Sequence, residues 1–191
     1  MSTLKVDTIL KRSGTGTITL GQSGDTLAIP AGATIANSGT ATGFGDNTPA
    51  FAVQKTTSQS VSNSTETKVQ HNSTKFDTNS GWDSSNYRYT IPTTGKYLVT
   101  HGVRFASTSA PRVISWVRKN ASGNDNLNTV EINPNSSGVS PGLSGSFIFD
   151  FTAGDYIEHY VFQNAGSSKD IETGGNHMPC FFQAMKVLIW V

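Results

Sequence analysis

The sequence predicts an all-β protein, and three observations lead to this prediction. Polar and apolar residues alternate with a period of two in several short segments, which is the pattern of strands with one buried face. β-Branched and aromatic residues are frequent in these segments, and many of the 19 glycines stand between them at turns. Only 14% of the residues are charged, which argues against a disordered chain. A chain of 191 residues has room for one sizeable domain and a small appendage.

Charge and cysteine content exclude several classes of function. The net charge of +1 gives no long-range field that would attract nucleic acid or an anionic membrane. The single cysteine, Cys180, excludes a disulfide within the chain and a metal site built from cysteines, and its phenylalanine neighbours predict a buried, inert thiol. No segment has the apolar length of a signal peptide or a membrane span. We therefore expect a protein that is made in a cytoplasm and does not use the standard secretory route.

The first twelve residues combine a basic cluster with apolar side chains. Residues 3–10 are predicted to form a short strand. This strand is either an amphipathic edge strand or an arm that docks on another protein by strand addition. The candidate attachment residues are Leu4, Lys5, Val6, Ile9, Leu10, Lys11 and Arg12.

Residues 13–43 contain no aromatic residue and one charged residue, Asp25. Short β-like runs at 17–20, 26–29 and 33–36 are separated by glycine-rich turns, which indicates a short repeat. One chain has too few apolar residues here to close a core, so we expect several copies to wind into a thin β-stalk; the alternative is a disordered linker. The candidate stalk residues are Ile18, Leu20, Leu27, Ile29 and Ile35. Glycine does not recur at every third position, which excludes a collagen stalk.

Residues 46–191 are predicted to form the main domain, and residues 1–45 the attachment arm and stalk. The segment FGDNT at 44–48 is the predicted linker between them. The main domain begins with two segments of strand character, at 50–57 and 66–72.

The segment 86–105 carries the clearest strand pattern of the chain. Residues 86–91 alternate polar and apolar side chains, and the turn Pro92–Gly95 follows, where proline presets φ and glycine tolerates a positive φ. The next strand places one row of side chains on a single face: Tyr97, Val99, His101, Val103 and Phe105. We expect the two strands to form a hairpin with at least one buried face.

Three further segments complete the predicted domain. In residues 112–120 alternate side chains face opposite sides of a strand. Residues 144–162 are predicted to form a second hairpin around an Ala-Gly-Asp turn at 153–155, with three phenylalanines on one face. The last predicted strand covers residues 179–191.

These segments resemble one trimeric jelly-roll family. Tyr89, Pro92, Gly95 and Tyr97 match the family pattern in which an aromatic residue precedes Pro-x-x-Gly-x-Tyr. The family contains tumour necrosis factor and the globular head of complement component one, subcomponent q, and the resemblance extends over residues 49–191. It implies a ten-strand antiparallel jelly roll, with the last strand beside the first, that forms a homotrimeric knob. It also implies binding rather than catalysis.

The sequence contains no motif for catalysis or cofactor binding. It has no phosphate-binding loop, dinucleotide fingerprint or nucleophile elbow. The four histidines do not fall at metal-ligand spacing, so we expect structural or interface imidazoles rather than a zinc site. No dense Asp-x-Asp run supports a calcium loop. We therefore expect no catalytic residue, no cofactor and no metal.

The opening segment STLKVDTI is similar to the starts of structural and fibre proteins of phages that infect cyanobacteria and other aquatic bacteria. Together the two resemblances imply a non-enzymatic homotrimer on the virion surface, made in the host cytoplasm, whose arm binds a capsid or tail protein. Two functions stay open. A capsid decoration (cement) protein is favoured, and the alternative is a short tail fibre whose loops bind a host-surface glycan or protein. The candidate ligand residues are Arg112, Asn124, Asp125, Asn135, Lys169 and Asp170.

Overall fold

The computed structural model describes residues 9–10, 16–34, 36, 48–106, 108, 112–121, 125–134, 138–173 and 180–187. The chain divides into two compact units, Met1–Phe44 and Gly45–Val191. Among the described residues the first unit contains no strand, and all strands belong to the second unit. The described part of the chain has no helix of the length and apolarity that a membrane crossing requires.

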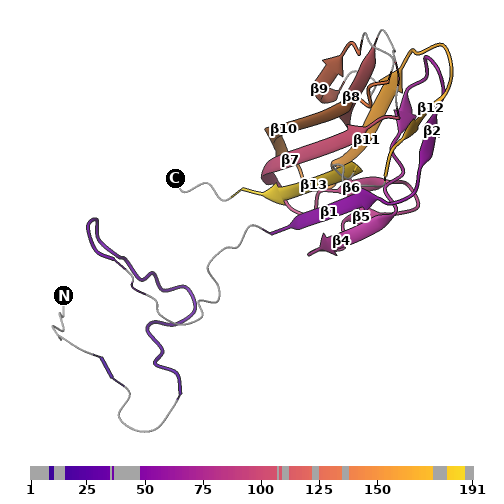
Figure 1. The fold of residues 1–191 in the computed structure, drawn as a ribbon. Coiled ribbons are helices and arrows are strands. Elements are labelled where there is room, and N and C mark those ends of the chain that lie inside the picture. The colour runs from indigo at the N-terminus through magenta and orange to yellow at the C-terminus, as the bar shows by residue number, and fades with distance from the viewer. Residues whose placement is uncertain are drawn as a thin grey trace. The chain divides into compact units, whose positions relative to one another are not determined.

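The second unit is an antiparallel β-sandwich (Figure 1). Its strands are β1 (Ala50–Lys55), β2 (Gln59–Val61), β3 (Thr67–Lys68), β4 (Ser73–Asp77), β5 (Trp82–Asp83), β6 (Arg88–Thr90), β7 (Gly95–Arg104), β8 (Val113–Lys119), β9 (Asn126–Ile132), β10 (Gly142–Phe151), β11 (Tyr156–Gln163), β12 (Lys169–Ile171) and β13 (Cys180–Lys186). The five-stranded sheet has the order β10-β7-β13-β1-β4. The six-stranded sheet has the order β5-β6-β11-β8-β9, with β3 paired to β11, and β2 pairs with β12. The predicted all-β class is confirmed.

The last strand lies in the centre of its sheet, beside the first. β13 pairs with β1 on one side and with β7 on the other, as the family resemblance implies. The register places Phe182 opposite Val53 and Ala184 opposite Phe51, so buried side chains stand next to one another across the strand pair. A one-residue slip would turn these side chains outward, and the buried face therefore fixes the register.

Both predicted hairpins are wrong, because each pair of consecutive strands lies in two different sheets. β6 pairs with β5 and β11, whereas β7 pairs with β10 and β13. In the same way β10 pairs with β7, and β11 pairs with β8. The turns at Pro92–Gly95 and at residues 152–155 form as predicted, but each crosses from one sheet to the other. Turn residues allow the chain to reverse, but they do not determine which strands pair. Here Tyr89 and Tyr97 contribute to the same core cluster from opposite sheets.

The core lies between the two larger sheets and is apolar at both ends. One cluster is aromatic: the rings of Phe51 and Tyr89 stack with centroids 3.9 Å apart, and Phe182 meets Phe51 edge-on at 5.2 Å. The other cluster contains Val61, Val69, Val103, Phe105, Val113, Leu143, Val161, Ile171 and Cys180. Each fully buried aliphatic or phenylalanine side chain contributes about 1.5–3 kcal/mol relative to exposure. The row from Tyr97 to Phe105 is buried, as predicted.

Candidate functional site

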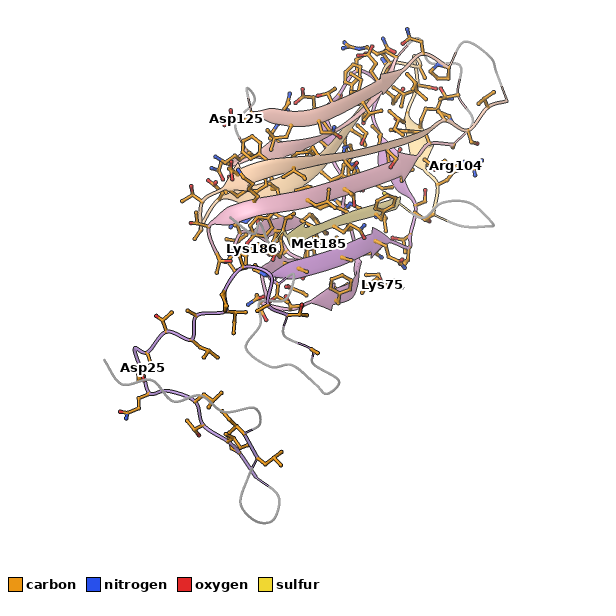
Figure 2. All side chains as sticks on the ribbon, turned by 90° about the vertical axis from the view of Figure 1, so that its left-hand side faces the viewer. Asp25, Lys75, Arg104, Asp125, Met185 and Lys186 are labelled. Carbon is orange, nitrogen blue, oxygen red and sulfur yellow. The ribbon has the colours of Figure 1, made fainter. Side chains whose placement is uncertain are left out.

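The outward face of the five-stranded sheet is the candidate functional site, and we call it the seam face. It consists of Ala50, Ala52, Phe76, Leu98, Thr100, Gly102, Ile148, Phe181, Gln183 and Met185. Alternation places these side chains outward, because their neighbours along each strand fill the core. Figure 2 labels Met185 beside β13 and Lys75 beside β4.

Pairing across the sheet brings the apolar side chains of the seam face into a continuous row. Leu98 stands opposite Met185 on one side and opposite Ile148 on the other. A hollow of about 300 Å³ opens between Phe76, Leu98 and Met185. Ile148 is 60% exposed, Phe76 51% and Met185 39%. Among the described residues of the second unit, the only other exposed large apolar side chain is Val139, so the exposed apolar groups gather on this face.

Phe181 adds a flat aromatic surface to the seam face. It stands opposite Gly102 on the neighbouring strand. A Cβ on Gly102 would lie 2.4 Å from Cε1 of Phe181, so the ring rests directly on the glycine backbone. A second hollow, of about 330 Å³, borders the ring together with Lys75 and Gln183. Glycine is therefore required here for close approach of the ring.

Charged groups on the seam face stand at its edges. The Lys96 ammonium pairs with the Asp150 carboxylate at one end, and Lys75 lies on the edge strand β4. The buried hydroxyl of Thr100, within the face, has no hydrogen-bond partner among the described residues. Burying this surface against another protein would therefore desolvate few charges.

The outward face of the six-stranded sheet differs, because its large side chains are already covered by charged ones. The Arg118 guanidinium lies 4.3 Å from the ring centroid of Tyr160 and pairs with Glu66 at 2.8 Å. Lys68 pairs with the buried Glu158 at 2.5 Å. Trp116 stacks on Tyr160 and is buried. Charged side chains thus cover large aromatic side chains on this face within one chain, whereas the exposed apolar side chains of the seam face have no such cover.

The predicted ligand residues lie on several elements. Arg112 precedes β8, where it forms a two-bond ion pair with Glu131 at 2.8 and 2.9 Å and lines a hollow of about 240 Å³. Asp125 is exposed immediately before β9, whose first residue, Asn126, lines the same hollow. Lys169 and Asp170 belong instead to the β2–β12 ribbon. Asn124 and Asn135 lie outside the described residues.

The predicted attachment and stalk residues are only partly described. Leu4, Lys5, Val6, Lys11, Arg12 and Ile35 lie outside the described residues. Ile9, Leu10, Ile18, Leu20, Leu27 and Ile29 are exposed. Residues 16–34 form turns at 22–25 and 30–33 but no strand, unlike the predicted runs at 17–20 and 26–29. A strand needs a hydrogen-bonding partner, and the single chain supplies none for these residues.

A polar layer that the sequence reasoning missed separates the two apolar clusters of the core. His101, Ser115 and His159 take the inward positions between apolar residues on β7, β8 and β11, and His71 joins them from the segment before β4. Burial lowers the pKa of His71 to about 3 and the pKa of His159 well below its ordinary value, so both rings are neutral. The period-two pattern placed His101 inward, but only the sheet pairing brings the other groups to it.

Comparison with known proteins shows the fold. No family model and no curated protein matches the chain. The globular domain of zebrafish complement 1qA is 17% identical, with a TM-score of 0.51, over 73% of this chain and 98% of that one. Eiger TNF from S. frugiperda is 14% identical, with a TM-score of 0.56, over 73% and 92%. Murine APRIL is 14% identical, with a TM-score of 0.55, over 72% and 98%. The chain therefore has the jelly-roll fold of these complement and tumour-necrosis-factor domains.

Proposed function

We propose that this protein is a homotrimeric structural protein of a bacteriophage virion that decorates the capsid and has no enzymatic activity. The single observation that carries the proposal is the seam face, an apolar sheet surface left open in one chain. The arm would attach the trimer to the particle, and the jelly-roll knob would face outward on the virion surface after synthesis in the host cytoplasm.

A second and a third copy of this chain are the proposed occupants of the seam face. Its exposed apolar side chains need a partner surface, and its centre carries no charge that would repel an identical copy. The exposed apolar residues of the arm, such as Leu20 and Leu27, have the same need. Three copies wound together would bury both sets at once. The sequence resemblance to a trimeric family supports this stoichiometry.

The bacteriophage assignment rests on the opening segment at residues 2–9, which resembles the starts of phage structural and fibre proteins. Ile9, the last residue of this segment, and the following Leu10 are exposed, which suits an arm that binds a capsid protein. Decoration is the preferred of the two virion functions, and the location of the protein on the particle distinguishes them.

A short tail fibre is the second candidate function, and one observation favours it. The hollow next to Arg112 on the six-stranded sheet combines Glu66, Arg112 and Asn126 with the apolar side chains of Ile114 and Phe162. A concave surface with few polar groups over apolar ones suits a host-surface glycan or protein.

Gold-labelled antibody against residues 46–191, imaged on whole virions, tests the proposal. Label scattered over the head is the result expected for a decoration protein. Label confined to the tail would replace decoration with the fibre function. Particles assembled without the protein serve as the control, and an absence of label from all intact virions would contradict both functions.

A further inference from the structure

Three side chains of types that can bind a metal ion meet inside the second unit. One ring nitrogen each of His71 and His159 and the Sγ of Cys180 lie within 4.8 Å of one another. His159 comes from β11, Cys180 from β13 and His71 from the segment between β3 and β4. All three residues are fully buried. Their separation along the chain explains why spacing rules for metal motifs do not detect them.

The hydrogen bonds of the polar layer fix which nitrogen of each neutral histidine carries its proton. Nε2 of His101 lies 3.3 Å from the backbone oxygen of Asn128, which can only accept, so this nitrogen is protonated. Nδ1 of His101 therefore accepts from the Ser115 hydroxyl at 2.9 Å. The Ser115 oxygen in turn accepts from Nε2 of His159 at 2.9 Å.

The chain of hydrogen bonds ends at a nitrogen of His71 that has no hydrogen-bond partner among the described residues. Because Nε2 of His159 carries the proton, its Nδ1 accepts from Nε2 of His71 at 3.1 Å. Nδ1 of His71 is then an unprotonated lone pair, and it has no hydrogen-bond partner among the described residues although it is buried. This unpaired lone pair can therefore accept a proton that is displaced from the other nitrogen of the same ring.

We propose that His71, His159 and Cys180 bind a transition-metal ion of the zinc class inside the jelly roll. A donor set of two imidazole nitrogens and one thiolate favours zinc, whereas calcium and magnesium favour oxygen ligands. Two nitrogens bound to one tetrahedral zinc ion are about 3.3 Å apart, given zinc–nitrogen bonds of about 2.0–2.1 Å. The facing nitrogens of His71 and His159 are 3.1 Å apart. The spacing of these two nitrogens is therefore close to the spacing that a shared zinc ion requires.

Ser115 and His101 supply the outer support that a metal-binding histidine needs. A ligating imidazole normally donates its second N–H to a neighbouring acceptor, which fixes the ring and its tautomer. His159 already donates its Nε2 proton to Ser115, which leaves Nδ1 free for the ion. The support is therefore in place before the metal binds.

Protons balance when the ion enters. The proton between the two rings moves from Nε2 of His71 to the free Nδ1 of the same ring, and His71 stays neutral. The Cys180 thiol loses its proton to solvent, so each divalent ion releases one proton. Burial raises the pKa of the Cys180 thiol to about 12, and the charge of the Lys55 ammonium, which donates to the Gln70 oxygen at 3.0 Å, acts against this rise. Nδ1 of His71 thus carries the proton that the ion displaces from Nε2.

Refolding of the untagged full chain in the presence of Co²⁺ or Zn²⁺ tests the proposal, because an ion can reach a fully buried site during folding. Cobalt should produce a thiolate-to-cobalt charge-transfer band in the near ultraviolet. Cys180 is the only cysteine, so this band reports the proposed site alone. Zinc should be retained at one ion per chain after gel filtration and should raise the melting temperature.

Two substitutions distinguish this site from adventitious binding. Cys180→Ala should abolish the charge-transfer band and the zinc-dependent rise in melting temperature, and His159→Ala should abolish retention of zinc. His177→Ala, which removes a histidine that the proposed site does not use, should change neither. The proposal is overturned if the wild-type chain retains no stoichiometric metal, if Cys180→Ala retains it, or if His177→Ala loses it. The wild-type measurement decides the matter even where a variant fails to fold.

Discussion

Gly145 determines how closely β10 approaches the polar layer, because a side chain at this position would occupy the space of two hydrogen-bonding groups. A Cβ on Gly145 would lie 1.9 Å from Oδ1 of Asn128 and 2.6 Å from Nε2 of His101. These are the two atoms that hydrogen-bond to each other at 3.1 Å. At the residue scale, the hydrogen bond between Asn128 and His101 therefore requires a residue without a side chain at position 145.

Gly145→Ala should destabilise the protein by about 1–3 kcal/mol, because the added methyl group forces the Asn128 and His101 side chains apart. Gly142→Ala on the same strand is the matched control, since a Cβ there meets no atom within 4 Å. The control should stay within about 0.5 kcal/mol of wild type. Urea unfolding followed by fluorescence measures both. Equal stability of the two variants would show that β10 does not pack as described.

Asp155 stabilises the turn between β10 and β11. Its carboxylate accepts from the Thr152 amide at 2.9 Å and from Asn120 Nδ2 at 2.8 Å, and it lies 3.3 Å from the Lys119 ammonium. Burial acts to raise the pKa of Asp155, but the hydrogen bonds from Asn120 and Thr152 and the Lys119 charge outweigh burial and lower it. The ionised carboxylate is therefore the form that stabilises the fold.

Asp155→Ala should lower the free energy of unfolding at pH 7 by about 1–2 kcal/mol. Because the folded-state pKa is depressed, this contribution is complete above the unfolded value of 3.8 and is lost as the pH falls through the folded value. The difference between variant and wild type should thus shrink from pH 7 to pH 3 in urea titrations. Asp125→Ala, at an exposed position, should have little effect at either pH. A pH-independent difference for Asp155→Ala would contradict the ionic role.

At the scale of single elements, the sequence predicts strands and turns better than it predicts their pairing. The alternation from Tyr97 to Phe105 correctly marks the buried face of β7, and the Pro92–Gly95 turn forms. The hairpin prediction fails because sheet membership depends on contacts between residues far apart in the chain, such as Phe182 opposite His101. The sequence does not predict the polar layer for the same reason. His101, Ser115 and His159 stand on three different strands, and only the pairing of these strands brings them together.

Met185→Glu should dissociate the proposed trimer while the single chain stays folded. Met185 is 39% exposed in one chain, so the substitution should change the stability of the isolated domain by less than about 0.5 kcal/mol. In an assembly the same position would bury a carboxylate of each copy without a partner. Val139→Glu, which replaces a 48% exposed residue in the segment before β10, is the matched control.

Analytical ultracentrifugation at micromolar concentration separates these outcomes. Wild type and Val139→Glu should sediment as trimers, and Met185→Glu as a smaller species. A monomeric wild type would contradict the trimer itself. A trimeric Met185→Glu would retain the trimer but move its interface away from the seam face.

At the scale of the whole molecule, the two units differ in how they can become stable. Every core residue of the described chain lies at position 51 or later, so the second unit completes its core without the first. The described part of the first unit exposes its large apolar side chains, including Ile18 and Leu27. The exposed apolar residues of the first unit therefore indicate that it binds a partner, but they do not identify that partner.

A fragment that begins at Asp46 should therefore fold, form the same trimer as the full chain and fail to bind the particle. Thermal unfolding followed by circular dichroism should give a melting temperature close to that of the full chain, because no described core residue is removed. Cosedimentation with virions assembled without the protein measures attachment, with the full chain as the positive control. An unfolded fragment would show that residues before 46 complete the domain. A folded fragment that still binds virions would move the attachment surface from the arm to the knob.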